Sequence, residues 1–119
     1  MKTEQFLKDN GINVEQGLEV LGDMEMYNET MSDFLEEQET RIPELKKYKE
    51  AGDCENYAIL AHAMKSDSKY LGFTKLIDLA YQHELKGKEN DIHFINENFD
   101  EFMKEANRIS SVCMEYLGR

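Results

Sequence analysis

Apolar side chains recur at steps of three and four residues along most of the chain, the spacing of helices that bury one face. The stripe is clearest near the C-terminal end, where it comprises Ile92, Ile95, Phe99, Phe102, Ala106, Ile109, Cys113 and Tyr116. No segment alternates apolar and polar residues as a half-buried strand does. The pattern therefore predicts an all-α protein.

Glycines and capping residues divide this pattern into separate helices. The glycines that fall between helical segments are Gly11, Gly22, Gly52, Gly72, Gly87 and Gly118. Asn13 and Asp23 are good N-cap residues. Pro43 removes one backbone donor, and we expect a kink there rather than a helix end. The expected helices span residues 3–9, 14–22, 23–50, 53–71, 74–86 and 92–116.

The expected architecture is an antiparallel up-and-down four-helix bundle with short additional N-terminal helices. A chain of 119 residues with 40% hydrophobic content supports one core, so residues 1–119 are expected to form a single domain. The alternative is a long coiled-coil dimer. Only the last helix keeps a heptad-like stripe, however, and the short connections favour packing within one chain and a monomer.

Charge and composition narrow the classes of partner. The chain has 25 acidic and 14 basic residues and a formal net charge of -11, which disfavours nucleic acids and anionic membrane surfaces. No leader-like or membrane-spanning apolar segment is visible, and Cys54 and Cys113 are expected to be reduced thiols. We therefore expect a cytoplasmic protein. Met1 and the final residues "YLGR" favour an independent protein over a fragment of a hybrid kinase.

The segment "LAHAMKSDSKYLGF", residues 60–73, places positive charge around a histidine in this acidic chain. On a helical wheel, His62 shares one face with Lys65, Ser66 and Lys69, and that face is predicted to point out of the bundle. Small neighbours, Ala58 and Ala61, would let another surface approach the imidazole. The residues predicted to face the core are Leu60, Ala63, Met64, Tyr70 and Leu71, with Ile59 at the margin.

This arrangement is suited to phosphoryl transfer. The ammonium groups of Lys65 and Lys69 disfavour protonation of the imidazole, which keeps the ring a neutral nucleophile. A ring nitrogen can attack phosphorus while nearby cations offset the charge on the phosphoryl oxygens. The chain has no glycine-rich phosphate loop and no obvious carboxylate cluster for magnesium beside His62, so it is not expected to bind ATP itself.

The stretch "HAMKSDSKYLG", residues 62–72, resembles the motif of histidine-containing phosphotransfer (HPt) domains. In that motif a histidine is followed by lysine at plus three, a small residue at plus four, and an apolar residue and glycine at plus nine and plus ten. Residues 11–37 are similar to the N-terminal half of the family, and the two helices after Gly72 match its hairpin. The matching motif positions are His62, Lys65, Ser66, Leu71 and Gly72.

The resemblance implies a phosphorelay intermediate rather than an enzyme. His62 would accept a phosphoryl group from the aspartyl phosphate of one receiver domain and pass it to the aspartate of another. Lys65 would neutralise the phosphate, and Gly72 would end the helix. The implied partners are response-regulator receiver domains and a sensor or hybrid histidine kinase. The receiver would supply Mg²⁺, so this chain is expected to hold no cofactor and no metal.

Three positions leave questions that residue type alone does not answer. Ser66 replaces the glycine usual in the family, and its hydroxyl could help to orient the imidazole or the phosphate. Lys69 is either a partner or phosphate contact or a solvated surface residue. Asp67 falls on the predicted core side, where a carboxylate needs a partner, and we expect Lys75 or Tyr81 to provide it.

Two other classes of function remain as alternatives. The first is a non-catalytic helical bundle that serves as an adaptor for signalling partners. The second is a metal-binding bundle, which requires Glu and Glu-x-x-His ligands pointing inward, whereas the seam of the last helix is apolar. His83 and His93 lack acidic or thiol neighbours at ligand spacing and are expected to be structural or surface residues.

Overall fold

The structure, a computed structural model, describes residues 1–119. It confirms the all-α prediction, and the helices lie within two residues of the expected bounds. They are α1 (Glu4–Asp9), α2 (Val14–Leu21), α3 (Met24–Ala51), α4 (Cys54–Leu71), α5 (Thr74–Lys88) and α6 (Ile92–Leu117). Helix α3 does not end at Pro43, as expected, and the kink expected there stays a prediction.

Local sequence signals account for most helix ends. An Asn or Asp side chain accepts a hydrogen bond from a first-turn backbone N–H at the start of four helices, which satisfies one otherwise unpaired donor in each. At the other end of α3, α4 and α6, a glycine adopts the left-handed conformation that side chains disfavour. The N-terminal caps are Asn13, Asp23, Asp53 and Asp91.

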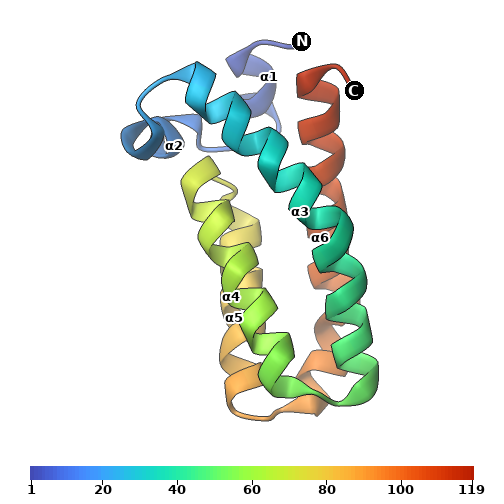
Figure 1. The fold of residues 1–119 in the computed structure, drawn as a ribbon. Coiled ribbons are helices and arrows are strands. Elements are labelled where there is room, and N and C mark those ends of the chain that lie inside the picture. The colour runs from blue at the N-terminus through green and yellow to red at the C-terminus, as the bar shows by residue number, and fades with distance from the viewer.

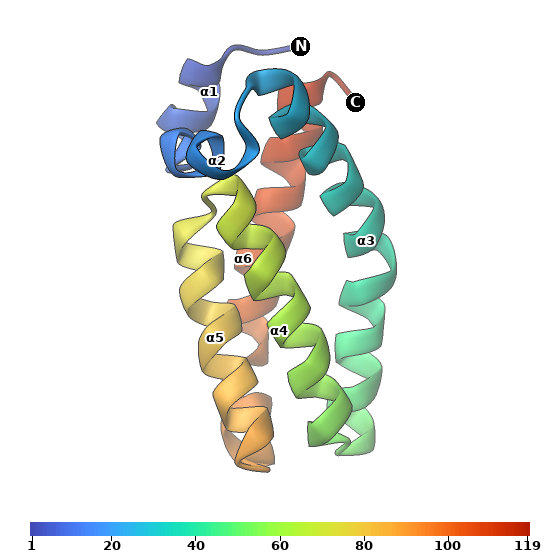
Figure 2. The same ribbon diagram turned by 60° about the vertical axis from the view of Figure 1, so that its left-hand side comes forward.

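The four long helices form a closed bundle (Figures 1 and 2). Helix α4 packs against α3 and α5, and α6 packs against α5 and α3, so each helix has two neighbours. Helices α1 and α2 lie across one end, where α1 contacts α6 and α2 contacts α3 and α4. Both chain termini lie at this end, and the Lys2 amide donates to the Tyr116 carbonyl at 2.8 Å.

The core runs along the inside of the bundle and confirms the apolar seam predicted for the last helix. Every position of that seam except Ile92 is buried, and Ile92 packs partly buried against the core. Each large apolar side chain that is fully buried stabilises the fold by roughly 1.5–3 kcal/mol. The largest fully buried side chains come from α3, α4 and α6 and from the α4–α5 turn: Tyr27, Phe34, Tyr57, Phe73, Phe102 and Tyr116.

Helices α4 and α5 approach each other closely because small residues face each other there. Gly87 was expected to lie between helices, but it lies inside α5, which ends at Lys88. A Cβ atom on Gly87 would stand 2.8 Å from the Ala58 Cβ and 3.0 Å from the Cys54 carbonyl oxygen. Ala61 is fully buried, so the prediction that it lets another surface approach was wrong, whereas Ala58 packs against α5 and also lines a groove described below.

The buried face of α4 is also rotated from the one predicted. Tyr70 was expected in the core but is 46% exposed, whereas Ser68 is fully buried. Met64 and Leu71 are buried as expected, and Leu60 and Ala63 are intermediate. The reason is that α4 is covered from two sides, by α3 and by α5, as well as by α2 at one end, so hydrophobicity alone does not define the centre of its buried face.

Candidate functional site

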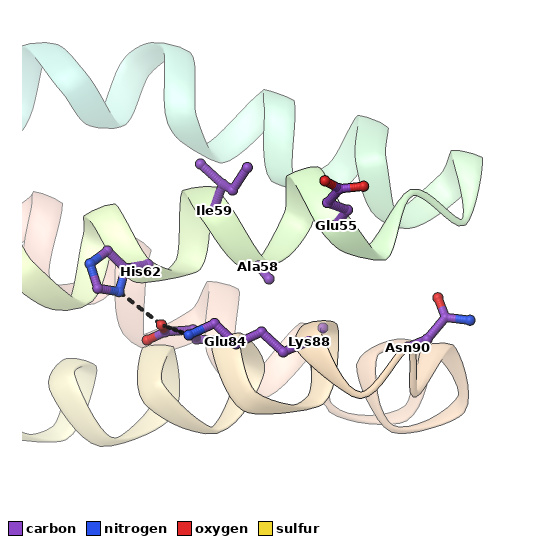
Figure 3. A pocket seen from close by; sticks show the side chains of 8 residues that line it. Glu55, Ala58, Ile59, His62, Glu84, Lys88 and Asn90 are labelled. Atoms are coloured by element: carbon purple, nitrogen blue, oxygen red, sulfur yellow. Dashed lines mark hydrogen bonds and ion pairs between the residues drawn. The ribbon is translucent and has the colours of Figure 1, made fainter.

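His62 lies near the middle of α4 on the wall that α4 and α5 form together (Figure 3). Its side chain is 57% exposed. It borders a groove of about 720 Å³, here called the His62 groove, whose lining includes Ala58, Ile59, His62, Glu84, Gly87 and Lys88. Because the groove opens to solvent on the side of the bundle, the imidazole is accessible to a macromolecular partner.

The imidazole is held by a buried carboxylate that the sequence analysis did not identify. Glu84 of α5 is only 3% exposed in its side chain, and its Oε2 atom lies 2.8 Å from Nδ1 of His62. Lys88 Nζ lies 2.8 Å from the same oxygen, and Lys65 Nζ lies 2.6 Å from Oε1. Figure 3 shows the His62 and Lys88 side chains converging on Glu84. One carboxylate therefore links two lysines to the histidine.

The charge state of Glu84 determines the protonation of the histidine nitrogens. Burial acts to raise the pKa of Glu84, but hydrogen bonds from Lys65, Lys88 and His62 outweigh it and lower this pKa to about 2. An ionised carboxylate only accepts hydrogen bonds, so Nδ1 of His62 must be the donor. In the neutral ring the lone pair then lies on Nε2. Nε2 makes no hydrogen bond within the chain, so its lone pair is unoccupied.

The sequence analysis expected the ammonium groups of Lys65 and Lys69 to be the charges beside the imidazole. The structure instead places the Glu84 carboxylate in direct contact with it. Lys65 was also expected to be exposed, but its side chain is 12% exposed because Glu84 and the ring of Tyr81 enclose it. Its Nζ lies 4.9 Å from the centre of that ring, within the range of a cation–π contact. Lys65 is thus a fixed cation of the α4–α5 contact.

Lys88 is the exposed cation beside His62, and sequence reasoning missed it together with Glu84. Its side chain is 63% exposed and lines the His62 groove. Both residues belong to another helix, 22 and 26 positions after His62, so no local motif connects them. A signal for Glu84 was nevertheless present, since it continues the buried stripe of Leu76, Ala80 and His83 on α5, where an unpaired acid is costly.

Ser66 and Lys69 lie farther along the same helix, and neither side chain makes a hydrogen bond to the imidazole. Ser66 is half-buried, and its hydroxyl makes no hydrogen bond to His62. Lys69 is exposed, and its side chain forms no ion pair. The Lys69 carbonyl accepts a bond from the Gln16 side chain at 3.4 Å. The structure thus leaves the Lys69 ammonium group free for an external anion or for solvent.

Asp67 has a partner, but not one of the two predicted. It lies 2.9 Å from Nη1 of Arg41 on α3, and its side chain is 36% exposed. Arg41 also approaches Glu37 at 3.6 Å. The expectation that Lys75 or Tyr81 would hold Asp67 was wrong because Asp67 faces α3 rather than α5. This ion pair joins α3 to α4.

The other two histidines have structural or surface positions, as expected. His83 is buried, its Nδ1 lies 2.8 Å from the Tyr57 hydroxyl, and its ring stacks on Phe102 with centroids 4.4 Å apart. Burial lowers the pKa of His83 to about 4, although a backbone hydrogen bond with Asn98 acts in the opposite direction. His93 is exposed and pairs at 2.9 Å with Glu97, an acidic neighbour four residues on that the sequence analysis overlooked.

Several further properties of the structure bear on the class of protein. Cys54 and Cys113 are buried free thiols, and burial raises the pKa of Cys113 to about 12. No group of three or more His, Cys, Asp or Glu side chains is arranged to hold a metal ion. None of the helices combines the length and apolar character needed to cross a membrane.

Comparison with known proteins gives one match. The family model described as "Hpt domain" matches residues 29–113, a region that reaches from α3 into α6 and includes all of α4 and α5. No curated protein and no solved structure matches the chain. The matched region contains His62, Glu84, Lys65 and Lys88.

Proposed function

This chain belongs to the Hpt domain family, and from this premise we propose that it carries a phosphoryl group on Nε2 of His62 between receiver-domain aspartates. Membership in the family implies a histidine phosphotransfer role in phosphorelay signalling. The observation that supports the assignment to His62 is its geometry. The imidazole is 57% exposed, and its Nδ1 is bound to a buried carboxylate at 2.8 Å.

The proposed transfer is a displacement at phosphorus. The Nε2 lone pair of His62 attacks the phosphorus of an aspartyl phosphate, the bond from phosphorus to the aspartate oxygen breaks, and its electron pair returns to the aspartate carboxylate. The ring becomes positively charged as the N–P bond forms. Glu84 faces this charge through the Nδ1–H bond and stabilises it, as a carboxylate does behind other catalytic histidines. The reverse steps deliver the group to a second aspartate.

The two lysines bound to Glu84 are proposed to play different parts. Lys65 keeps the carboxylate ionised and in place, because it is enclosed and fixed at 2.6 Å from Oε1. Lys88 shares Oε2 with His62 and is 63% exposed, so it can turn from Glu84 toward a phosphoryl oxygen without desolvation. Neutralisation of the phosphate, assigned to Lys65 by resemblance, is thus proposed to fall mainly to Lys88, with Lys69 as a contact for the partner.

The remaining groups needed for transfer are assigned to the partner. The proposal places Mg²⁺ and the acceptor aspartate on the receiver domain, and the original phosphoryl donor on a sensor or hybrid histidine kinase. The chain acts as a phosphoryl carrier in the cytoplasm, as a monomer and a single domain over residues 1–119. The open His62 groove, with exposed Ile59 at its edge, supports docking of a protein surface on this wall.

Transfer from a radiolabelled, phosphorylated receiver tests the proposal. Wild-type protein should acquire label that is labile in acid and stable in alkali, and His62→Gln should acquire none. His93→Gln is the matched control because His93 is also an exposed histidine paired with a glutamate. If His62→Gln is labelled as well as wild type, the site assignment is wrong. If the wild type binds receivers but is never labelled, the chain is an adaptor.

A further inference from the structure

Helices α4 and α5 come very close at Gly87, one helical turn from the bond between Glu84 and His62. Gly87 follows Glu84 by three positions on α5. Ala58 precedes His62 by four positions on α4, and Figure 3 shows its side chain directed toward α5. A Cβ atom on Gly87 would stand 2.8 Å from the Ala58 Cβ, 3.2 Å from the Ala58 Cα and 3.0 Å from the Cys54 carbonyl oxygen.

These distances leave no space for a side chain at Gly87. Contacts between nonbonded carbon atoms are normally about 3.5–4.0 Å long. The three opposing atoms belong to the backbone of α4 or are bonded directly to it, so none of them can turn aside as the end of a long side chain can. Any substitution of Gly87 must therefore move α4 and α5 apart.

The bond between His62 and Glu84 would take up most of such a movement. Helices α4 and α5 are joined by the turn at residues 72–73, and Phe73 in that turn is buried in the core. The two helices can therefore separate at Gly87 only by opening away from this turn. The His62–Glu84 pair lies much nearer to Gly87 than to the turn, so it opens almost as far.

This bond has little margin. The distance from Nδ1 of His62 to Oε2 of Glu84 is 2.8 Å, and N–H···O bonds extend to about 3.2 Å, which leaves about 0.4 Å. Lys88, on the same helix as Glu84, binds the same oxygen at 2.8 Å and would keep it. Lys65 has a long flexible stem and can follow the carboxylate across a wider gap. The imidazole is therefore the partner that would be lost first.

We propose that Gly87 is a positioning residue, whose missing side chain lets α4 and α5 lie close enough for Glu84 to hold the proton on Nδ1 of His62. The hydrogen bond made by one ring nitrogen of a neutral imidazole decides which nitrogen carries the proton. Gly87 thereby keeps the lone pair on Nε2. The effect on phosphoryl transfer rests on the function proposed above, whereas the position of the proton does not.

Long-range ¹H–¹⁵N NMR spectra of the unphosphorylated protein test the position of the proton, at a pH where the imidazole is neutral. His62→Gln identifies the His62 signals by their loss. In the wild type most molecules should carry the proton on Nδ1, and in Gly87→Ala the ratio of the two tautomers should shift toward Nε2–H by roughly three- to tenfold. An unchanged ratio in Gly87→Ala would overturn the proposal. If Gly87→Ala unfolds in buffer, both proteins are compared in trimethylamine N-oxide, which favours the folded state.

Gly17→Ala is the control for a general loss of packing. A Cβ atom on Gly17 would stand 2.6 Å from Cε2 of Tyr27 and 2.9 Å from the Tyr70 carbonyl oxygen, so this substitution also crowds a helix contact. Tyr70 lies eight positions beyond His62 on α4, at the end that carries the turn to α5. Gly17→Ala should therefore lower stability without changing the tautomer ratio of His62. An equal shift in Gly17→Ala would show that Gly87 has no special role.

A compensating substitution tests the contact itself. Adding Ala58→Gly to Gly87→Ala removes the methyl group at 2.8 Å and leaves the longer contacts, so the tautomer ratio should return partway to the wild-type value. No return in the double variant would contradict the role of this contact.

The rate of label transfer from a phosphorylated receiver measures the consequence for function. Gly87→Ala should be labelled roughly three- to tenfold more slowly than the wild type, and Gly17→Ala at the wild-type rate. A wild-type rate in Gly87→Ala despite a shifted tautomer ratio would contradict a role in transfer. If the wild type is never labelled, the proposed function fails, and the tautomer ratio still decides whether Gly87 positions His62.

Discussion

The Glu84 carboxylate accepts hydrogen bonds from His62, Lys65 and Lys88. Replacement by glutamine tests the effect of its negative charge while the size of the side chain is kept. Glu84→Gln keeps the volume but removes the negative charge behind the imidazole. Because hydrogen bonds to charged groups contribute about 1.5–3 kcal/mol, phosphoryl transfer to His62 should slow by roughly ten- to a hundredfold. The measurement is the initial rate of label transfer from a phosphorylated receiver. Glu97→Gln, beside the exposed His93, is the control and should leave that rate unchanged.

The two lysines on Glu84 should respond differently to replacement by methionine. Lys65→Met removes an enclosed partner of a buried carboxylate and should lower the free energy of unfolding by roughly 1.5–3 kcal/mol. Lys88→Met alters an exposed residue and should change the free energy of unfolding by less than about 1 kcal/mol. The same substitution should slow phosphoryl transfer. Urea unfolding and transfer rates measure both effects. A Lys88→Met variant with the wild-type transfer rate would remove Lys88 from the mechanism.

At the level of elements, Gly72 fixes the end of α4 against the start of α2. Its φ angle is +79°, and a Cβ there would stand 1.9 Å from the Asn13 carbonyl oxygen. Gly52 has a φ angle of +67° and nothing within 4 Å of such a Cβ. Gly52→Ala should therefore cost only the left-handed strain, about 1–2 kcal/mol. Gly72→Ala should cost roughly 2–5 kcal/mol, because α2 must also move.

Thermal or urea unfolding of the two alanine variants provides this comparison, since both substitutions add one methyl group at a left-handed helix end. Equal losses of stability in the two variants would show that the contact between Gly72 and Asn13 is unimportant. A larger loss in Gly72→Ala would show that the short N-terminal helices are part of the folded unit rather than an appendage.

The helices could be predicted because their signals are local. Asn13 and Asp23 cap helices within three residues of their own position, and Gly72 ends one by its backbone conformation. Contacts between helices were harder to predict. Gly87 looked like a helix end because its close neighbour, Ala58, lies 29 positions earlier on another helix. The motif around His62 was visible because its residues are close together in the sequence. Glu84 was missed because it lies on another helix, 22 positions after His62.

For the molecule as a whole, burial of His83 predicts a loss of stability in mild acid. The folded-state pKa of His83 is about 4, below the ordinary value of 6.5, so the unfolded chain binds the proton more readily. Stability from this group is present above pH 6.5 and is lost as the pH falls toward 4. Between pH 7 and pH 5 the free energy of unfolding should fall by about 2 kcal/mol.

Urea unfolding at pH 7 and at pH 5 measures this difference in the free energy of unfolding. His83→Gln should remove most of the difference. His93→Gln is the control, because His93 is exposed and should leave the dependence intact. Glu84 adds a separate loss at lower pH, since its pKa is lowered from 4.5 to about 2. A wild-type protein equally stable at pH 5 and pH 7 would contradict the burial of a neutral His83.

The bundle was predictable as a whole because its longest apolar seam needs partners along its full length. The groove beside His62 was not, because it depends on side chains from two helices that lie apart in the sequence. His62 and Glu84 meet across α4 and α5. Only the packed structure shows which of these residues are neighbours.

The meeting of both chain ends beside α1 has a practical consequence. A fluorophore, an affinity handle or a solid support attached to either end would stand at the capped end of the bundle. His62 lies near the middle of α4, partway down the side wall. Protein immobilised through either end would thus present the same wall to an incoming partner, and surface-based binding measurements would not depend on which end is tethered.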